Sequence, residues 1–200
     1  MKNTLPKLKI SYNAPVTLTF IFISLIILIL NSILGGVLTT KCFSVYRSSL
    51  TDPLAYVRMF GHVLGHIDYN HFIANALPIL ILGPGLEERY GSRTVLFAIF
   101  IAAFTSGLFW FIAFPQYSLL GASGIVFMMI MLSTFGNVRD GCIPLTCIVV
   151  MVLYVGGEIL DAIFAADTVS QTAHIIGALC GTVLGFLLRQ KEKGHNGRAA

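Results

Sequence analysis

Two residues with catalytic chemistry, Ser123 and His174, lie in stretches that are otherwise apolar enough to be buried in a membrane. A serine at bilayer depth can hydrogen-bond to its own helix, whereas an ionisable histidine there is costly and points to function by default. A serine activated by a neighbouring base is a common nucleophile. The pair therefore predicts a nucleophile and its general base on two different helices.

The serine lies in Gly121-Ala122-Ser123-Gly124, at the expected start of a helix. Its small neighbours leave room for another chain, and the free N–H groups of a helix N-terminus are directed at the same space. Such donors stabilise an oxyanion. The motif fits helix-packing glycines with a backbone-bonded serine as well, so it leaves both interpretations open.

The histidine precedes a stripe of glycines, because Gly177, Gly181 and Gly185 share one helical face with His174. This doubled GxxxG pattern permits close contact between membrane helices. If the partner is the helix that begins near Ser123, His174 Nε2 can reach the serine hydroxyl and act as its base. A histidine bonded to a neighbouring helix carbonyl is the alternative.

Another polar pair, His71 and Asn75, occupies positions i and i+4 of a further apolar segment. Both side chains carry N–H donors, which an acyl-transfer intermediate needs in a dry site. An interhelical polar clamp explains the pair equally well. His62 and His66 are also four residues apart, but the HExxH pattern is missing, so we expect hydrogen bonds that fix an outer loop and no metal.

The composition favours a membrane protein, since 56% of the 200 residues are hydrophobic and 11% are charged, against roughly 25% charged in soluble domains. The net charge of +4 lies toward the ends of the chain, which indicates a topology signal and no nucleic-acid partner. The four cysteines form no paired framework, and only Cys42 falls outside the expected cytoplasmic and membrane segments, so we expect no disulfide.

The apolar runs predict an all-α bundle of six transmembrane helices. The predicted helices cover 16–38, 71–86 with a lead-in from 57, 94–114, 122–135, 143–160 and 172–188. The first is too long for a signal peptide, and the second and fourth are short for a bilayer. We therefore expect a cytoplasmic segment over 1–15, one domain over 16–188, and a cytoplasmic tail over 189–200 that is polar and disordered from residue 190.

The basic residues orient this bundle. With the N-terminus inside, ten Lys and Arg residues fall on the inner side and three on the outer side. The positive-inside rule then places both termini in the cytoplasm and the serine and histidine toward the outer face. The outer connection 39–56 has room for short interfacial helices.

The ordered motifs between residues 58 and 188 resemble the rhomboid family of intramembrane serine proteases, in its basic six-helix bacterial form. The motifs that carry this resemblance are Arg58, His62-x3-His66, His71-x3-Asn75, Gly83/Glu87/Gly91-Ser92, Gly121-x-Ser123-Gly124 and Ala173-His174-x2-Gly177-x3-Gly181. Two positions depart from the family pattern: Phe127 stands where many members have tyrosine, and Val57-Arg58 replaces a Trp-Arg pair. Neither departure removes a reacting atom.

The resemblance implies a catalytic dyad without a carboxylate, in which Ser123 is the nucleophile and His174 the general base. It also implies an oxyanion hole from His71, Asn75 and the Ser123 backbone N–H, room for substrate at Gly121, and a ring stacked under the catalytic histidine at Phe127. By the resemblance, Asp161 and Asp167 do not complete a triad, although both lie near the histidine in sequence.

The resulting prediction is peptide-bond hydrolysis in or next to transmembrane segments of other proteins, in the bilayer of a bacterial cell membrane and without a cofactor. The loop 161–171 is expected to cap the site, and the fifth helix to act as its gate. A catalytically silent rhomboid-like protein that holds membrane clients is the first alternative. A small transporter is the second, although inverted repeats are not apparent. The sequence does not define an oligomeric state.

Overall fold

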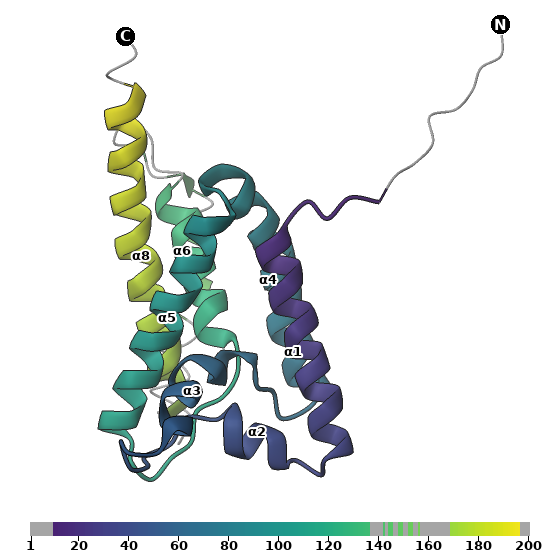
Figure 1. Ribbon diagram of the computed structural model, residues 1–200. Coiled ribbons are helices and arrows are strands. Elements are labelled where there is room, and N and C mark those ends of the chain that lie inside the picture. Colours follow the sequence, from purple (N-terminus) through teal and green to yellow (C-terminus); the bar gives the residue numbers. More distant parts are fainter. Residues whose placement is uncertain are drawn as a thin grey trace, which may run out of the picture.

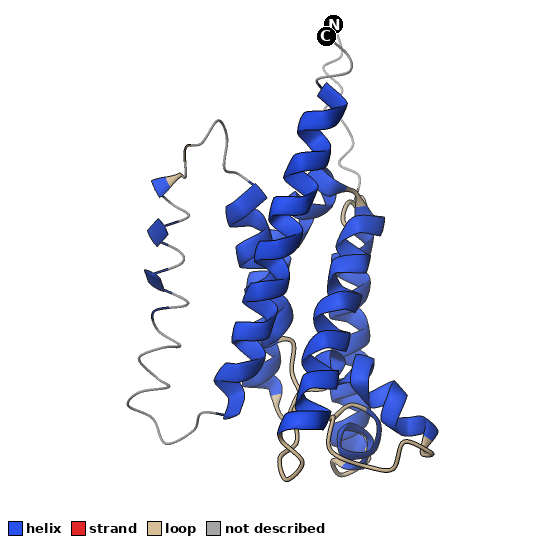
Figure 2. Ribbon diagram, turned by 90° about the vertical axis from the view of Figure 1, so that its left-hand side faces the viewer, coloured by secondary structure: helices blue, strands red, loops and turns tan. Residues whose placement is uncertain are grey.

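The computed structural model describes residues 10–136 and 169–196, with single positions between 142 and 156. Within this part every regular element is a helix, and an isolated antiparallel bridge joins Val45 to Leu119 (Figure 2). The helices are α1 (Pro15–Ile33), α2 (Val37–Cys42), α3 (Pro53–Gly61), the 3-10 turn η1 (His62–Leu64), α4 (Tyr69–Tyr90), α5 (Ser92–Ala113), α6 (Ser123–Gly136) and α8 (Val169–Asn196). The predicted all-α class is confirmed for the described residues.

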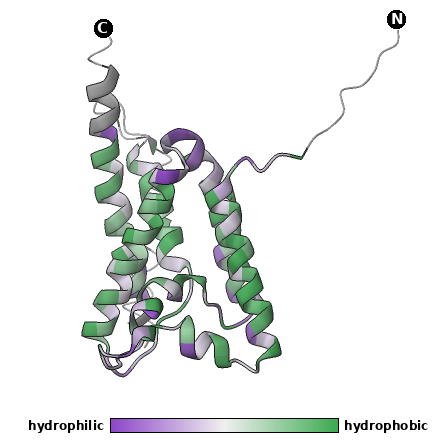
Figure 3. Cartoon of the chain, in the orientation of Figure 1, coloured by the Kyte–Doolittle hydropathy of each residue, from purple (hydrophilic) through white to green (hydrophobic). Residues whose placement is uncertain are grey.

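The long helices run side by side in two groups. α1 lies beside α4, while α5, α6 and α8 form the other group (Figure 1). The short helices α2 and α3 lie at one end, and the α4–α5 turn lies at the other end with the last turns of α8. The helices are mainly hydrophobic along their length, and hydrophilic residues gather at the α4–α5 turn (Figure 3).

Three of the described helices are long and apolar enough to cross a membrane. They are α1, α5 and the part of α8 from Gln171 to Arg189, with mean hydropathies of 2.5, 2.3 and 1.6. The 14-residue α6 is shorter but apolar, and ten of its residues are buried, as expected of a helix that is hydrophobic all round. The chain is therefore an integral membrane protein. The predicted fifth helix over 143–160 lies mostly outside the described residues, so six spans stay a prediction.

The first helix ends five residues earlier than predicted, at Ile33. Gly35 and Gly36 have φ values of 62° and 87°, in the left-handed region that interrupts a right-handed helix. The apolar run continues past this break, which is why its pattern predicted one helix to residue 38. The chain instead turns and forms α2, so the outer connection does contain two short helices, α2 and α3.

The second predicted helix, over 71–86, corresponds to α4, which is longer than predicted. With 22 residues it is not short for a bilayer. It begins after Asp68, whose side chain caps the His71 N–H at 2.8 Å, and it ends at Gly91, which has a φ of 80°. The lead-in expected from residue 57 is a separate helix, α3. The charged residues from Glu87 onward predicted an end to the helix, but they lie inside it.

Glu87 is 5% exposed because its carboxylate accepts hydrogen bonds from the first turn of α1. The Thr17 N–H donates at 2.7 Å and the Val16 N–H at 3.2 Å, so an acidic side chain of α4 satisfies free donors at the N-terminus of α1. The two helices also approach closely at Gly83, where an added Cβ would lie 2.3 Å from Thr17 Oγ1.

The last helix also extends beyond its predicted end. α8 continues to Asn196, so the prediction of a disordered tail from residue 190 is wrong for residues 190–196. The segment after Arg189 is rich in Gln, Lys and Glu, which have high intrinsic helix propensity. Polarity suggested a tail there, whereas propensity favours continuation of the helix.

Candidate active site

The glycine stripe of α8 packs directly on the backbone of α6. A Cβ added to Gly177 would lie 2.1 Å from the Gly124 carbonyl oxygen, and one added to Gly181 would lie 2.2 Å from the Met128 carbonyl oxygen. The contact continues at Gly185, where an added Cβ would lie 2.9 Å from Phe135 Cβ. The contacts advance together along both chains, so α6 and α8 run parallel. The doubled GxxxG pattern therefore predicted a close contact, and the structure identifies α6 as the partner helix.

This contact brings the turn that carries His174 next to the turn that carries Ser123. Ser123 is the first residue of α6, and Phe127 follows it by one turn on the same face. The rings of Phe127 and His174 are stacked, with centroids 4.6 Å apart and planes 11° apart. The imidazole therefore lies against the face of α6 that begins with the serine. Both Ser123 and His174 are half-buried.

Three further predicted site residues, Gly121, His71 and Asn75, meet just before α6. A Cβ on Gly121 would lie 2.7 Å from His71 Nε2 and 3.8 Å from Asn75 Nδ2, and the φ of +114° at this position also favours glycine. Asn75 is buried and donates from Nδ2 to the His71 carbonyl oxygen at 3.1 Å. The structure thus places N–H donors of α4 beside the backbone two residues before Ser123.

His62 holds this backbone in place from the outer connection. Its carbonyl oxygen accepts the Gly121 N–H at 2.9 Å. Its ring lies between the Arg58 carbonyl oxygen, 3.3 Å from Nδ1, and the Ser106 hydroxyl, 3.3 Å from Nε2. A carbonyl can only accept, so the proton is on Nδ1. The Nε2 lone pair lies beside the Ser106 hydroxyl, whose proton is directed to the Ala102 carbonyl oxygen at 2.7 Å. Burial lowers the pKa of His62 to about 4, which keeps the ring neutral.

Sequence reasoning did not identify Ser106 as a partner of this histidine. The only signal was a hydroxyl residue in the apolar run of the third predicted helix, and nothing local linked it to His62. His66, the other histidine of the pair, lies 3.3 Å through Nδ1 from the Leu64 carbonyl oxygen. Both rings thus make hydrogen bonds in the outer connection, as the sequence predicted.

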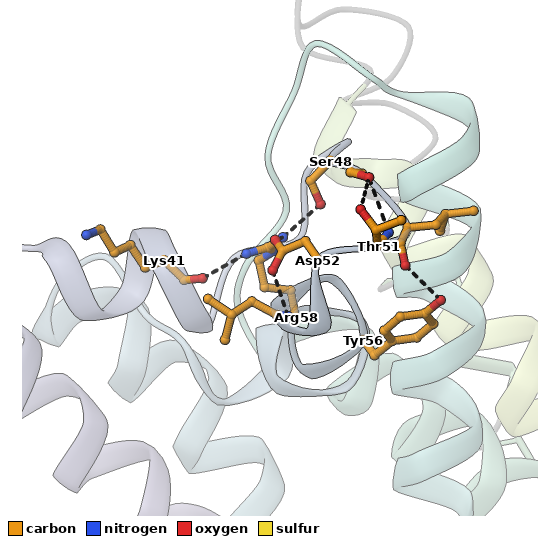
Figure 4. Close-up of polar contacts among 9 residues, drawn as sticks. Lys41, Ser48, Thr51, Asp52, Tyr56 and Arg58 are labelled. Atoms are coloured by element: carbon orange, nitrogen blue, oxygen red, sulfur yellow. Dashed lines mark hydrogen bonds and ion pairs between the residues drawn. The ribbon is translucent and has the colours of Figure 1, made fainter.

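Arg58 anchors the outer connection. Its guanidinium donates to Asp52 Oδ2 at 2.6 Å, Ser48 Oγ at 2.7 Å and the Lys41 carbonyl at 3.1 Å (Figure 4). It also lies over the Tyr46 ring, 4.4 Å from the ring centroid. The hydrogen bond from Arg58 lowers the pKa of the Asp52 carboxyl. Arg58 is 1% exposed and its neighbour Val57 is 48% exposed. The arginine therefore joins the end of α2 to the start of α3 although tryptophan is absent at residue 57.

The arrangement supplies the parts of an acyl-transfer site. A serine hydroxyl begins a helix, an imidazole lies against the same helix, and side-chain donors approach from α4. Acyl transfer requires a nucleophile, a base and oxyanion donors in an arrangement of this kind. Asp161, Asp167 and most of the predicted gate lie outside the described residues. Of the predicted cap over 161–171, residues 169–171 belong to the first turn of α8 and the others lie outside the described residues.

Comparisons with known proteins identify relatives along most of the chain. A model of the rhomboid domain family matches residues 53–191. Rhomboid protease GluP of Bacillus subtilis is 26% identical over 93% of this chain, and Rhomboid-related protein 1 of Caenorhabditis elegans is 30% identical over 69% of it. An uncharacterised protein of Mycobacterium tuberculosis is 30% identical over 88% of this chain and 75% of its own length. This chain spans 38% of the Bacillus relative and 41% of the Caenorhabditis one.

Proposed function

The chain belongs to the rhomboid family, and from this premise we propose that it is an intramembrane serine endopeptidase that uses Ser123 and His174 as a dyad. The observation that carries the proposal is the parallel contact of α6 and α8, with the His174 ring stacked on Phe127 one turn after Ser123. A helix contact of this kind fixes the base relative to the nucleophile without needing a carboxylate.

In the proposed reaction, Ser123 Oγ attacks the carbonyl carbon of a peptide bond while His174 accepts the hydroxyl proton. The carbonyl oxygen becomes an oxyanion, which receives hydrogen bonds from the His71 and Asn75 side chains and from the Ser123 backbone N–H. His174 then donates its proton to the leaving amine, and water hydrolyses the acyl-enzyme by the same steps in reverse order. Gly121 leaves the space beside the donors open for the substrate backbone.

The proposed setting is a bacterial cell membrane, with six spans over 16–188 and both termini in the cytoplasm. The site would then open toward the outer face, and the substrates would be transmembrane proteins whose cleavable segment lies in or near the bilayer. The excess of basic residues on the inner side supports this orientation. The proposed mechanism takes no cofactor.

The test combines covalent labelling with substrate cleavage. Purified protein in detergent or liposomes is treated with a fluorophosphonate probe and, separately, with a generic transmembrane substrate. We expect the wild type to be labelled and to cleave, and Ser123→Ala and His174→Ala to do neither. Ser118→Ala, which changes an exposed loop serine, is the matched control and keeps both activities.

A folded wild-type protein that is not labelled and does not cleave would contradict the proposal. If such a protein still bound transmembrane segments, it would instead be a non-catalytic, client-holding member of the family. Labelling that persists in Ser123→Ala would show that another residue is the nucleophile.

A further inference from the structure

A narrow cavity lies behind the proposed oxyanion donors, between α1 and α4. It is too narrow to admit a water molecule. Three polar side chains line it: Ser24 of α1, His66 of the segment before α4, and Asn75 of α4. Its other lining residues are apolar. Because water does not fit, these side chains can satisfy one another only across the cavity.

Ser24, like Thr17 and Thr39, has a buried hydroxyl without a hydrogen-bond partner, and so differs from four other hydroxyl residues in the described helices. Ser32, Thr105, Ser106 and Thr182 each donate to the carbonyl oxygen four residues earlier, which is the usual solution for a serine or threonine in a helix. Ser24 is 1% exposed, and its hydroxyl has no hydrogen-bond partner, either in its own helix or elsewhere. Its proton is therefore available to an acceptor across the cavity.

His66 offers that acceptor. Its Nδ1 faces the Leu64 carbonyl oxygen, so the ring proton is on Nδ1 and Nε2 carries a lone pair. This Nε2 is buried and has no hydrogen-bond partner, and the residue is 1% exposed. Burial, with a smaller effect of His71, lowers the pKa of His66 to about 4, so Nε2 remains an acceptor at neutral pH.

The same ring contacts the oxyanion side of the site. It meets His71 edge-to-face, with centroids 5.1 Å apart and planes 72° apart, and it meets Phe72 in the same manner at 5.5 Å. Asn75 has two amide N–H groups, and one of them donates to the His71 carbonyl oxygen. The second N–H is the one available to an oxyanion. It can also donate to the unsatisfied lone pair of His66 Nε2 on the cavity side.

We propose that Ser24 and His66 form a positioning pair for the oxyanion hole. Neither atom has a partner as the side chains stand, so the pair forms by a rotation of the Ser24 side chain that brings its hydroxyl to His66 Nε2. This bond holds the His66 ring against His71 and leaves the second Asn75 N–H for the substrate oxyanion. Without the serine hydroxyl, His66 Nε2 competes with the oxyanion for that N–H. This inference rests on the proposed protease function and extends the site to α1.

The test is a double-mutant cycle on kcat with a transmembrane substrate. We expect Ser24→Ala to lower kcat roughly tenfold with little change in KM, less than the ~10²–10³-fold loss on removal of an oxyanion donor. In an Asn75→Ala background the same change should have no further effect on kcat, because the Asn75 N–H for which His66 Nε2 and the oxyanion compete is then absent. Adding His66→Phe, which keeps an edge-to-face ring but removes the lone pair, should restore part of the kcat lost in Ser24→Ala. Ser32→Ala, an exposed serine of the same helix, is the matched control.

An unchanged kcat in Ser24→Ala, or an equal fall in both backgrounds, would overturn the inference. Thermal unfolding of wild type, Ser24→Ala, His66→Phe and the double variant reports the coupling of the pair without catalysis, and additive shifts would also overturn it. If Ser24→Ala does not fold, Ser24→Thr replaces it and should retain kcat if the hydroxyl is what matters; a tenfold loss there would count against the pair. A wild type that does not cleave at all contradicts the proposed function instead.

Discussion

At the residue scale, the orientation of the proposed base, His174, depends on one stacked pair of rings. His174 lies flat on Phe127, and offset stacking of aromatic rings contributes about 0.5–1.5 kcal/mol. We expect Phe127→Leu to lower kcat by roughly two- to tenfold, because a branched aliphatic side chain no longer fixes the plane of the imidazole. Phe127→Tyr keeps the ring and should retain kcat. Steady-state cleavage of a transmembrane substrate gives kcat for both variants. An equal kcat in Phe127→Leu and wild type would exclude a role for the stacked rings.

Two buried histidines give the stability of the fold a pH dependence. Burial lowers the pKa of His62 and of His66 from 6.5 to about 4. Between pH 6.5 and 4 the unfolded chain therefore binds more protons than the folded one, so stability falls as the pH falls through this window and is unaffected by these groups above it. We expect the melting temperature in detergent to drop between pH 7.5 and pH 5.

The control for this pH effect is His62→Asn, which keeps a polar side chain but does not titrate in this range. Its melting temperature at neutral pH is expected to be lower than that of wild type, because the contact with Ser106 is changed. Its decline between pH 7.5 and pH 5 should be shallower. A decline as steep as in wild type would show that His62 is charged in the folded protein.

The residues that sequence reasoning identified are those whose partners are set by spacing along one helix. His71 with Asn75 and the glycines after His174 share faces that the helical period dictates, and the structure places them as expected. Ser24 and Ser106 were missed because their histidine neighbours come from the outer connection: Ser24 lines a cavity with His66, and Ser106 contacts His62. Such contacts depend on how the helices pack, which no local pattern encodes.

At the scale of elements, α1 depends on α4 for its N-terminal hydrogen bonds. Glu87 accepts from the Thr17 and Val16 N–H groups, and hydrogen bonds to a charged group contribute about 1.5–3 kcal/mol. We expect Glu87→Gln to lower the stability of the protein by about 1–2 kcal/mol, because a neutral amide accepts more weakly. Glu88→Gln changes the exposed neighbour and should have little effect. Unfolding in detergent compares the two, and equal stabilities would mean that the cap contributes nothing.

The helix boundaries show what hydropathy can and cannot predict. The pattern placed the ends of α5 and the start of α6 within two residues, because polarity and turn residues change there together. It failed at Gly35 and Gly36, where left-handed φ values end a helix inside an apolar run. It failed again at Glu87, which is charged but has buried partners on α1. Backbone conformation and long-range hydrogen bonds decided both boundaries.

At the scale of the whole molecule, the proposed site lies where the two groups of helices meet. α4 belongs with α1 and supplies the donors His71 and Asn75, while α6 and α8 supply Ser123 and His174. Arg58 and His62 join these groups through the outer connection, since His62 binds both Gly121 and the α5 residue Ser106. The relative position of the groups is therefore part of the geometry of the site.

The packing of α8 on α6 should accordingly control both stability and activity. A methyl group at Gly181 meets the Met128 carbonyl oxygen at 2.2 Å, so Gly181→Ala must push the helices apart. Overpacking of this kind costs about 1–3 kcal/mol, and a displacement of about 1 Å at a catalytic group can cost ~10²-fold in rate. We expect Gly181→Ala to melt at a lower temperature and to cleave far more slowly, although it lies two turns from His174. Gly85→Ala is the matched control, because nothing lies within 4 Å of its added methyl group and alanine favours the helix. If the two variants melted and cleaved alike, the close contact of α6 and α8 would not be what aligns the dyad.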